Sequence, residues 1–218
     1  MMGNSRMRLP RVYPILDTES LAARGILLET AAAAFLDGGA GILQIRHKGH
    51  WARGLFESAR QVARLCRESG VPLVINDRAD FALLLEAGLH VGQDDLPPRD
   101  ARRLMGPDAT IGYSSHNPQQ LCAAGGEPVD YVALGPVFAT GSKRNPDPVT
   151  GVDEVRQCRT LVEKPLVAIG GITLDNALDV LRAGADSVAV IAGMLPASPT
   201  AQSLRQRMEE WHQLVTAA

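Results

Sequence analysis

Eight short apolar runs alternate with helix-period segments along the whole 218-residue chain, and this alternation constrains the fold more than any other feature. The runs have the composition of buried strands, and we expect strands at 12–16, 41–46, 72–76, 89–91, 110–114, 131–134, 166–169 and 187–191. Glycines stand where the intervening helices should stop, at Gly38, Gly39, Gly70, Gly88, Gly125, Gly126 and Gly184. The repeated unit is therefore a strand, a helix and a glycine turn.

The intervening segments carry apolar residues at three- and four-residue spacing, as at Leu27, Ala31, Ala34 and Phe35. Eight consecutive strand-helix units predict an α/β fold, a single-domain (β/α)8 TIM barrel over residues 1–218, with 1–11 as a flexible N-terminal segment. An open doubly wound sheet is the alternative, and the lack of an early glycine-rich dinucleotide turn disfavours it. A barrel also requires that function sit on the loops that follow the strands.

Composition narrows the function further. A net charge of -2 and a pI near 6.2 argue against broad nucleic-acid or membrane binding, so any anion must be bound locally. The three cysteines are odd in number and lack metal-ligand spacing, which is typical of free thiols in a reducing compartment. We therefore expect a cytoplasmic protein with small-molecule partners, without nucleic-acid or membrane partners; a homo-oligomer is compatible with a barrel.

The longest predicted loop, residues 135–151, follows the sixth strand and has the length of an active-site lid. Hydroxyls at Thr140 and Ser142 stand beside the cations Lys143 and Arg144, which gives this lid the donors that an anionic ligand needs. A solvated surface loop is the alternative. Polar site residues concentrate on loops held by rigid scaffolds, which favours the lid.

Polar residues alternate with other residues at the end of the second strand. A pleat of period two sends Gln44, Arg46 and Lys48 to one face, which would be the barrel mouth. Two cations there require an anion or a carboxylate. A strand-end salt-bridge cluster is the alternative, and His47 is expected at the surface or in packing.

Acidic residues end the third and fourth strands, in Asn76-Asp77-Arg78 and Gly92-Gln93-Asp94-Asp95. Adjacent carboxylates suit Mg²⁺, which takes hard oxygen ligands and commonly uses one or two carboxylates together with substrate phosphate. Alternatively, Asp77 caps the helix that starts near Ala79, and Asp94 or Asp95 caps the turn before Pro97. Together with the cations of the second strand, the acids favour a metal-diphosphate site.

The fifth strand ends in Ser114-Ser115-His116, where Ser114 is a candidate ligand contact. A nucleophilic Ser-His pair is disfavoured because no Gly-x-Ser-x-Gly elbow exists here, and Ser115 or Asn117 should cap the next helix. After the seventh and eighth strands, Gly170-Gly171 and Ile191-Ala192-Gly193 fall where barrels of this type bind phosphate through backbone amides.

These segments, in this order, closely resemble the thiamine phosphate synthase family over nearly the whole chain. The resemblance is carried by Gln44-Ile45-Arg46-His47-Lys48, Ile75-Asn76-Asp77-Arg78, His90-Val91-Gly92-Gln93-Asp94-Asp95, Gly112-Tyr113-Ser114-Ser115-His116, Gly135-Pro136-Val137-Phe138-Ala139-Thr140-Gly141-Ser142-Lys143 and Ile169-Gly170-Gly171-Ile172. No single motif is specific, but their joint order and spacing are.

The resemblance implies a transferase that joins 4-amino-2-methyl-5-(diphosphooxymethyl)pyrimidine to a thiazole ethyl phosphate by a dissociative mechanism. It places the pyrimidine diphosphate on Gln44, Ile45, Arg46, His47, Lys48, Asn76, Ser114 and Lys143, of which Arg46, Lys48, Ser114 and Lys143 act in catalysis. It places Mg²⁺ on Asp77 and Asp95, and the thiazole phosphate on Thr140, Gly141, Ser142, Gly171, Ile191 and Ala192. Relatives often have serine where this chain has Ala192, so only a backbone contact is expected there.

Two other functions are compatible with the same barrel. A thiazole tautomerase of similar sequence would use His116 as its acid-base residue, and a non-catalytic barrel would only bind phosphate ligands. Neither requires the acids and lysines of a metal-diphosphate pocket, which favours the synthase.

Overall fold

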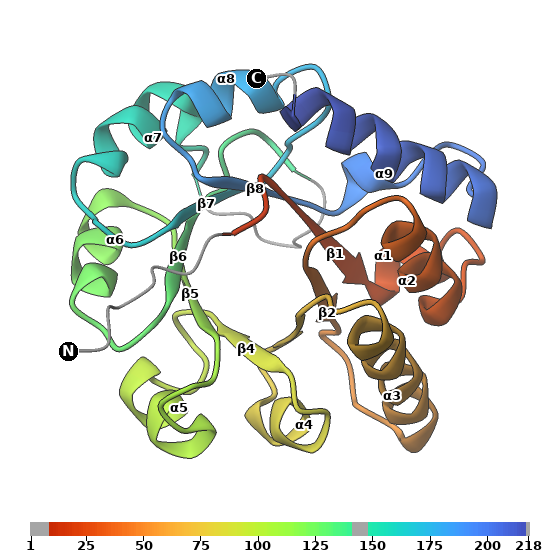
Figure 1. Ribbon diagram of the computed structural model, residues 1–218. Coiled ribbons are helices and arrows are strands. Elements are labelled where there is room, and N and C mark those ends of the chain that lie inside the picture. Colours follow the sequence, from red (N-terminus) through yellow and green to blue (C-terminus); the bar gives the residue numbers. More distant parts are fainter. Residues whose placement is uncertain (1–8, 141–147, 217–218) are drawn as a thin grey trace.

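The computed structural model describes residues 9–140 and 148–216, which form a closed barrel of eight parallel strands in the order β1 to β8 (Figure 1). The strands are β1 (Val12–Asp17), β2 (Leu43–Arg46), β3 (Leu73–Asn76), β4 (Gly88–Val91), β5 (Ile111–Ser115), β6 (Tyr131–Leu134), β7 (Leu166–Ile169) and β8 (Ser187–Val190). Parallel pairing of β1 with β8, in which Val12 lies opposite Val188, closes the barrel. This confirms the predicted TIM barrel and excludes the open sheet.

Helices surround the strands on the outside of the barrel (Figure 1). They are α1 (Thr18–Ala22), α2 (Leu28–Asp37), α3 (Arg53–Glu68), α4 (Ala79–Leu84), α5 (Pro98–Met105), α6 (Pro118–Gly125), α7 (Gly151–Arg159), α8 (Ala177–Arg182), the 3-10 helix η1 (Ala192–Met194) and α9 (Ala201–Thr216). The last helix, α9, packs beside α2 (Figure 1). Within the described ranges, no helix is both long enough and apolar enough to cross a bilayer.

Strand side chains alternate between two cores. The inner core lies within the barrel and includes Tyr13, Ile15, Val74, Tyr131, Ala133, Val167 and Ala189. The outer core lies between strands and helices and includes Leu16, Leu43, Ile45, Ile75, Leu89 and Val188. Because a pleated strand has a period of two, each strand presents alternate residues to the barrel interior, and the ends of these inward rows form the polar mouth described below.

Two local predictions are wrong. Leu27, expected on the buried face of a helix, is 70% exposed just before α2, and Leu28 is buried in its place. Gly88, expected to stop α4, is the first residue of β4, and Glu86 instead takes the left-handed conformation at that helix end, with φ 55°. Gly88 is needed for packing, because a Cβ atom there would lie 2.9 Å from the carbonyl oxygen of Thr110.

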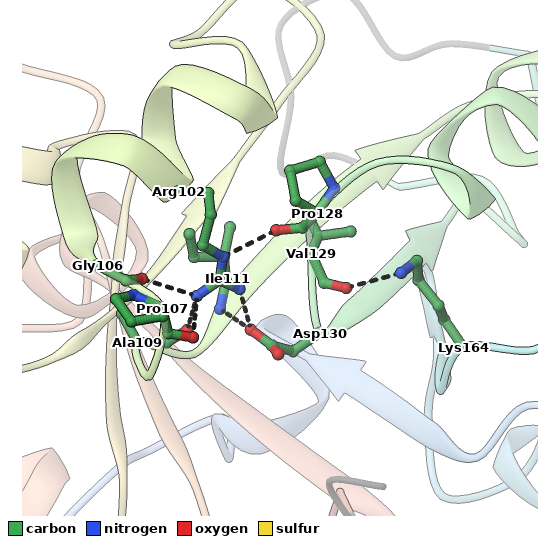
Figure 2. A network of polar contacts seen from close by, with 9 residues as sticks. All are labelled: Arg102, Gly106, Pro107, Ala109, Ile111, Pro128, Val129, Asp130 and Lys164. Atoms are coloured by element: carbon green, nitrogen blue, oxygen red, sulfur yellow. Dashed lines mark hydrogen bonds and ion pairs between the residues drawn. The ribbon is translucent and has the colours of Figure 1, made fainter. Parts of the chain in front are cut away.

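The amino ends of β5 and β6 are tied together by a polar network (Figure 2). Asp130, the residue before β6, accepts hydrogen bonds from the N–H of Ile111 (2.7 Å) and from Nη2 of Arg102 (2.8 Å). The Arg102 guanidinium also donates to the carbonyl oxygens of Gly106, Pro107, Ala109 and Pro128. One arginine of α5 thus joins a helix end to the starts of two strands.

The same arrangement recurs between β7 and β8. Asp186, the residue before β8, accepts from the N–H of Leu166 and from Nη1 of Arg159, both at 2.8 Å. We call the Arg102–Asp130 and Arg159–Asp186 pairs the two clasps. Because they lie at the amino ends of the strands, they stabilise the barrel at the face opposite the functional loops.

Candidate active site

A cavity of about 530 Å³ opens at the carboxyl ends of the strands. All eight strands or the loops after them contribute to its lining, as a barrel requires. Its apolar lining includes Ile15, Ala133, Val167, Ile169 and Ala189. Its polar wall includes Gln44, Arg46, Lys48, Asn76, Asp77, Asp95 and Ser114. The predicted polar residues of β2, β3, β4 and β5 therefore converge on one site.

The end of β2 and the loop after it contribute three side chains to this cavity, Gln44, Arg46 and Lys48. Ile45 lies between them in sequence but packs in the outer core. His47 also points away, and its Nδ1 lies 2.7 Å from the hydroxyl of Thr18. Ile45 and His47 therefore do not line the cavity, and contact with a ligand there would have to use their backbone.

Carboxylates face both cations, Arg46 and Lys48. Asp17, at the end of β1, forms an ion pair with Arg46 and is buried. The ammonium of Lys48 lies 2.6 Å from Oδ2 of Asp77. The strand-end salt bridges that were the alternative prediction are thus present in the structure. The same two cations also line the open cavity.

Asp77 and Asp95 form a carboxyl pair beside Lys48. Burial and the hydrogen bond with Asp95 raise the pKa of Asp77 to about 6, although Lys48 acts to lower it. Asp77 also has a left-handed backbone, with φ 66°, which is uncommon outside glycine and concentrates at functional sites. A proton shared by two carboxyls indicates a position that a cation would stabilise.

The predicted capping role is wrong for Asp77 and is confirmed for Asp95. Helix α4 begins after Arg78 without a side-chain cap, so the prediction that Asp77 caps it is wrong. Asp95 does close the turn before Pro97, because its Oδ2 accepts from the N–H of Gly92 at 2.7 Å. Its position in that turn also holds its carboxyl toward Asp77. Asp94 is exposed and does not line the cavity.

The oxygen atoms at this corner suit a hard cation. Within the described ranges, no group of three or more histidine, cysteine, aspartate or glutamate side chains is placed to hold a metal. Two carboxylates are the usual protein contribution to a Mg²⁺ site that is completed by water and substrate phosphate. The residues present therefore fit Mg²⁺ better than Zn²⁺, which takes three or four protein ligands.

Asn76 and Ser114 complete the polar wall. Asn76 is buried, and its Nδ2 has no hydrogen-bond partner among the described residues. Since buried donors are normally satisfied, this atom indicates a ligand acceptor or a water. Ser114 accepts or donates at 2.8 Å from Nε2 of His90. Asn117, not Ser115, caps α6 by accepting from Gln120, so that capping prediction is confirmed for Asn117.

The loops after β6, β7 and β8 contribute four residues of the phosphate prediction to the cavity lining, which are Thr140, Gly171, Ile191 and Ala192. Gly171 has φ 63°, and a Cβ atom there would lie 2.5 Å from the carbonyl oxygen of Ala139. Only glycine allows the loop after β7 and the loop after β6 to approach this closely. Gly141, Ser142 and Lys143 lie outside the described residues.

Sequence reasoning missed several cavity residues, which are Tyr13, Ser20, Arg24, His90 and Tyr131. A signal for some of them was present. The period-two pattern applied to β2 also sends Tyr13, Ile15 and Asp17 inward from β1. Ser20 and Arg24 carried no comparable signal, because they lie in α1 and the turn after it.

Known proteins share both the sequence and the fold. The family model described as thiamine monophosphate synthase matches residues 12–194. A thiamine-phosphate synthase of Koribacter versatilis is 47% identical over 214 residues, covering 97% of this chain and 98% of that protein. One of Xanthobacter autotrophicus is 42% identical over 195 residues, covering 89% and 92%.

Among solved structures, a thiamine phosphate pyrophosphorylase of Pyrococcus furiosus superposes with a TM-score of 0.81 at 29% identity, covering 95% of this chain and 96% of that one. A native KDPGal structure superposes with a TM-score of 0.73 at 13% identity, which shows the fold alone. Sequence likeness, family model and barrel geometry agree, and the chain belongs to the thiamine monophosphate synthase family.

Proposed function

We propose that this protein condenses 4-amino-2-methyl-5-(diphosphooxymethyl)pyrimidine with a thiazole ethyl phosphate, giving thiamine monophosphate and diphosphate. The observation that carries the proposal is the convergence of Arg46 and Lys48 with the Asp77–Asp95 carboxyl pair on one cavity. Cations and a carboxyl pair together suit a diphosphate with its divalent metal. Family membership supplies the two heterocycles.

Each half of the cavity takes one substrate. The pyrimidine diphosphate is held by Gln44, Arg46, Lys48, Asn76, Ser114 and Lys143. The thiazole phosphate is held by Thr140, Gly141, Ser142, Gly171 and the backbone of Ile191 and Ala192. Support comes from the cavity lining of the described members of both sets.

The reaction proceeds by departure of diphosphate. The bond between the pyrimidine methylene carbon and the diphosphate oxygen breaks, and its electron pair leaves with the diphosphate. Arg46 and Lys48 stabilise the negative charge that develops there. Bound to Asp77 and Asp95, Mg²⁺ would supply further positive charge to the same oxygens.

The cation left on the pyrimidine is delocalised by its amino group. The thiazole nitrogen, held nearby by its phosphate, donates its lone pair and forms the new carbon-nitrogen bond. Apolar side chains such as Ile15, Val167 and Ile169 keep water from the cation. No protein nucleophile is needed, because the electron pair of the breaking bond leaves with the diphosphate.

The test is a reaction of purified protein with both heterocyclic phosphates and Mg²⁺, followed by chromatography for thiamine monophosphate and diphosphate. Formation of both products in equal amounts supports the synthase. Proton exchange on the thiazole phosphate without diphosphate release would indicate a tautomerase, and binding without turnover would indicate a binding barrel. Either result contradicts the proposal.

Two variants sharpen this test. Lys48→Ala should lower kcat strongly, because a cation that stabilises the leaving group is lost. Lys164→Ala is the matched control: Lys164 Nζ donates to the carbonyl of Val129 at 2.9 Å, away from the cavity. Equal loss of activity in both variants would argue against a role of Lys48 in diphosphate departure.

A further inference from the structure

Five polar side chains form a continuous hydrogen-bonded chain across the barrel interior. Gln44 Nε2 donates to Tyr13 Oη (3.0 Å), which lies 3.1 Å from Tyr131 Oη. Tyr131 Oη lies 3.0 Å from Nδ1 of His90, and His90 Nε2 lies 2.8 Å from Ser114 Oγ. All of them except Ser114 are buried, and all five line the cavity.

The amide of Gln44 sets the direction of every hydrogen bond in this chain, because an NH₂ group can only donate. Tyr13 accepts from it and must donate its own hydrogen to Tyr131. Tyr131 then accepts from Tyr13 and donates to Nδ1 of His90. A neutral imidazole whose Nδ1 accepts carries its hydrogen on Nε2, and this N–H donates to Ser114.

We propose that this chain makes Ser114 an obligatory hydrogen-bond donor to the ligand, with Tyr131 and His90 as positioning residues. Ser114 Oγ already accepts from His90, so its own hydrogen is directed into the cavity. An anionic oxygen requires a donor of this kind. The identification of this anion as the pyrimidine diphosphate rests on the proposed function. The direction of the hydrogen bonds in the chain does not depend on it.

The surroundings of Tyr13 and Tyr131 keep their hydroxyls protonated and hold the ring of Tyr131 in place. Burial raises the pKa of both Tyr13 and Tyr131 far above the ordinary value. Each hydroxyl therefore stays protonated and can donate its hydrogen bond to the next residue of the chain. The rings of His90 and Tyr131 stack with centroids 5.6 Å apart, which fixes their relative orientation. A Cβ atom at Gly112 would lie 2.1 Å from Cζ of Tyr131, so the glycine keeps the place of this ring open.

The direction is tested without any substrate. Full-length protein labelled with ¹⁵N-histidine should show His90 as the Nε2–H tautomer at about pH 8, its signals being assigned by their loss in His90→Gln. Tyr131→Phe should give a mixture of tautomers, because no hydroxyl then donates to Nδ1. An Nδ1–H tautomer in the unsubstituted protein would mean that the chain runs from Ser114 to Gln44, and it would overturn the proposal.

The role of Ser114 is tested by a double-mutant cycle on kcat/KM for the pyrimidine diphosphate. Tyr131→Phe should lower kcat/KM about tenfold in the native background and less than about twofold beside Ser114→Ala, because its effect passes through Ser114. Tyr113→Phe, which removes a hydroxyl outside the chain, should leave kcat/KM unchanged. Equal factors in both backgrounds would show that Tyr131 acts only on folding or on another group.

Tyr13→Phe provides a second route if Tyr131→Phe fails to fold. It leaves Tyr131 in place and removes only the link to Gln44, so it should also give mixed His90 tautomers and a smaller, Ser114-dependent loss of kcat/KM. Retention of the pure Nε2–H tautomer would contradict control by Gln44. A pure Nε2–H tautomer in a protein that forms no thiamine monophosphate would count against the proposed function alone.

Discussion

At the scale of single residues, the most unusual group is the carboxyl of Asp77. It lies between a cation and a second carboxyl, has a left-handed backbone, and has a pKa raised to about 6. Because this pKa is above the ordinary value, the protonated form stabilises the metal-free fold, and that contribution is lost as the pH rises through about 6. A cation bound to the pair would replace the proton and remove this penalty.

Two substitutions should therefore move the pKa of Asp77 in opposite directions. Asp95→Asn should lower it, because a neighbouring carboxyl is removed, and Lys48→Met should raise it, because a stabilising cation is removed. The measurement is a ¹³C NMR titration of the carboxyl groups in metal-free protein, with Asp77→Asn for assignment. An unchanged pKa of Asp77 in both variants would show that burial alone controls this group.

At the scale of elements, the loops after β6, β7 and β8 interlock through backbone contacts. The N–H of Val137 donates to the carbonyl of Ile169 (2.9 Å), and that of Phe138 to the carbonyl of Gly170 (3.0 Å). The first residues after β6 are thereby held against the β7 loop, where Gly171 leaves no room for a side chain. Residues of these loops belong to the proposed thiazole phosphate site, whose geometry therefore depends on this contact.

Gly171→Ala should raise the KM for the thiazole phosphate about tenfold to hundredfold, because the new Cβ must displace the backbone at Ala139. The matched control is Gly70→Ala. Gly70 has φ 66°, close to that of Gly171, but nothing lies within 4 Å of its Cβ position. Both variants should lose about 1 kcal/mol of stability from the strained backbone, and steady-state kinetics should separate them. A similar KM in the two variants would contradict the steric argument.

The two clasps at the amino ends of the strands contribute to the free energy of unfolding and lie away from the cavity. Asp130→Ala should lower the free energy of unfolding by about 2 kcal/mol, because the N–H of Ile111 and the Arg102 guanidinium both lose an acceptor. Asp186→Ala should behave alike, since its contacts are equivalent. Urea unfolding measures the loss, and unchanged KM values for both substrates serve as the internal control. A rise in KM would mean that the clasps influence the distant cavity.

At the scale of the whole molecule, closure of the barrel packs the first elements of the chain against the last ones. β1 pairs with β8, α9 packs on α2, and Trp211 of α9 donates from Nε1 to the carbonyl of Gly193 at the cavity rim (3.3 Å). Trp51, which precedes α3, belongs to the same outer core. No unit of this barrel can complete its core without its neighbours.

Unfolding should therefore be a single cooperative transition. Tryptophan fluorescence, which reports on Trp51 and Trp211, and far-ultraviolet circular dichroism should give the same urea midpoint. Trp51→Phe leaves Trp211 as the only tryptophan and should keep the coincidence. A fluorescence change that precedes the loss of helix signal would reveal an independently unfolding part of the barrel.

Much of this protein can be predicted from its sequence alone. Strand positions, strand faces and the polar ends of β2 to β5 follow from hydrophobic periodicity, because alternation along a pleated strand is a local property. The metal-diphosphate hypothesis followed from the residue types at those ends. Boundaries such as Gly88 and Leu27 were wrong, because packing against Thr110 and the exact start of α2 depend on neighbours distant in sequence.

Only the tertiary structure decided which side chains meet. Closure of the barrel brings Tyr13 to Tyr131, 118 residues apart. Pairing of neighbouring strands brings Arg46 to Asp17 and Lys48 to Asp77, each 29 residues apart. A period-two pattern assigns a residue to a face but cannot say which residue of another strand lies opposite. That depends on strand register and barrel closure, which bring together the members of the hydrogen-bonded chain and the two carboxyls that raise the pKa of Asp77.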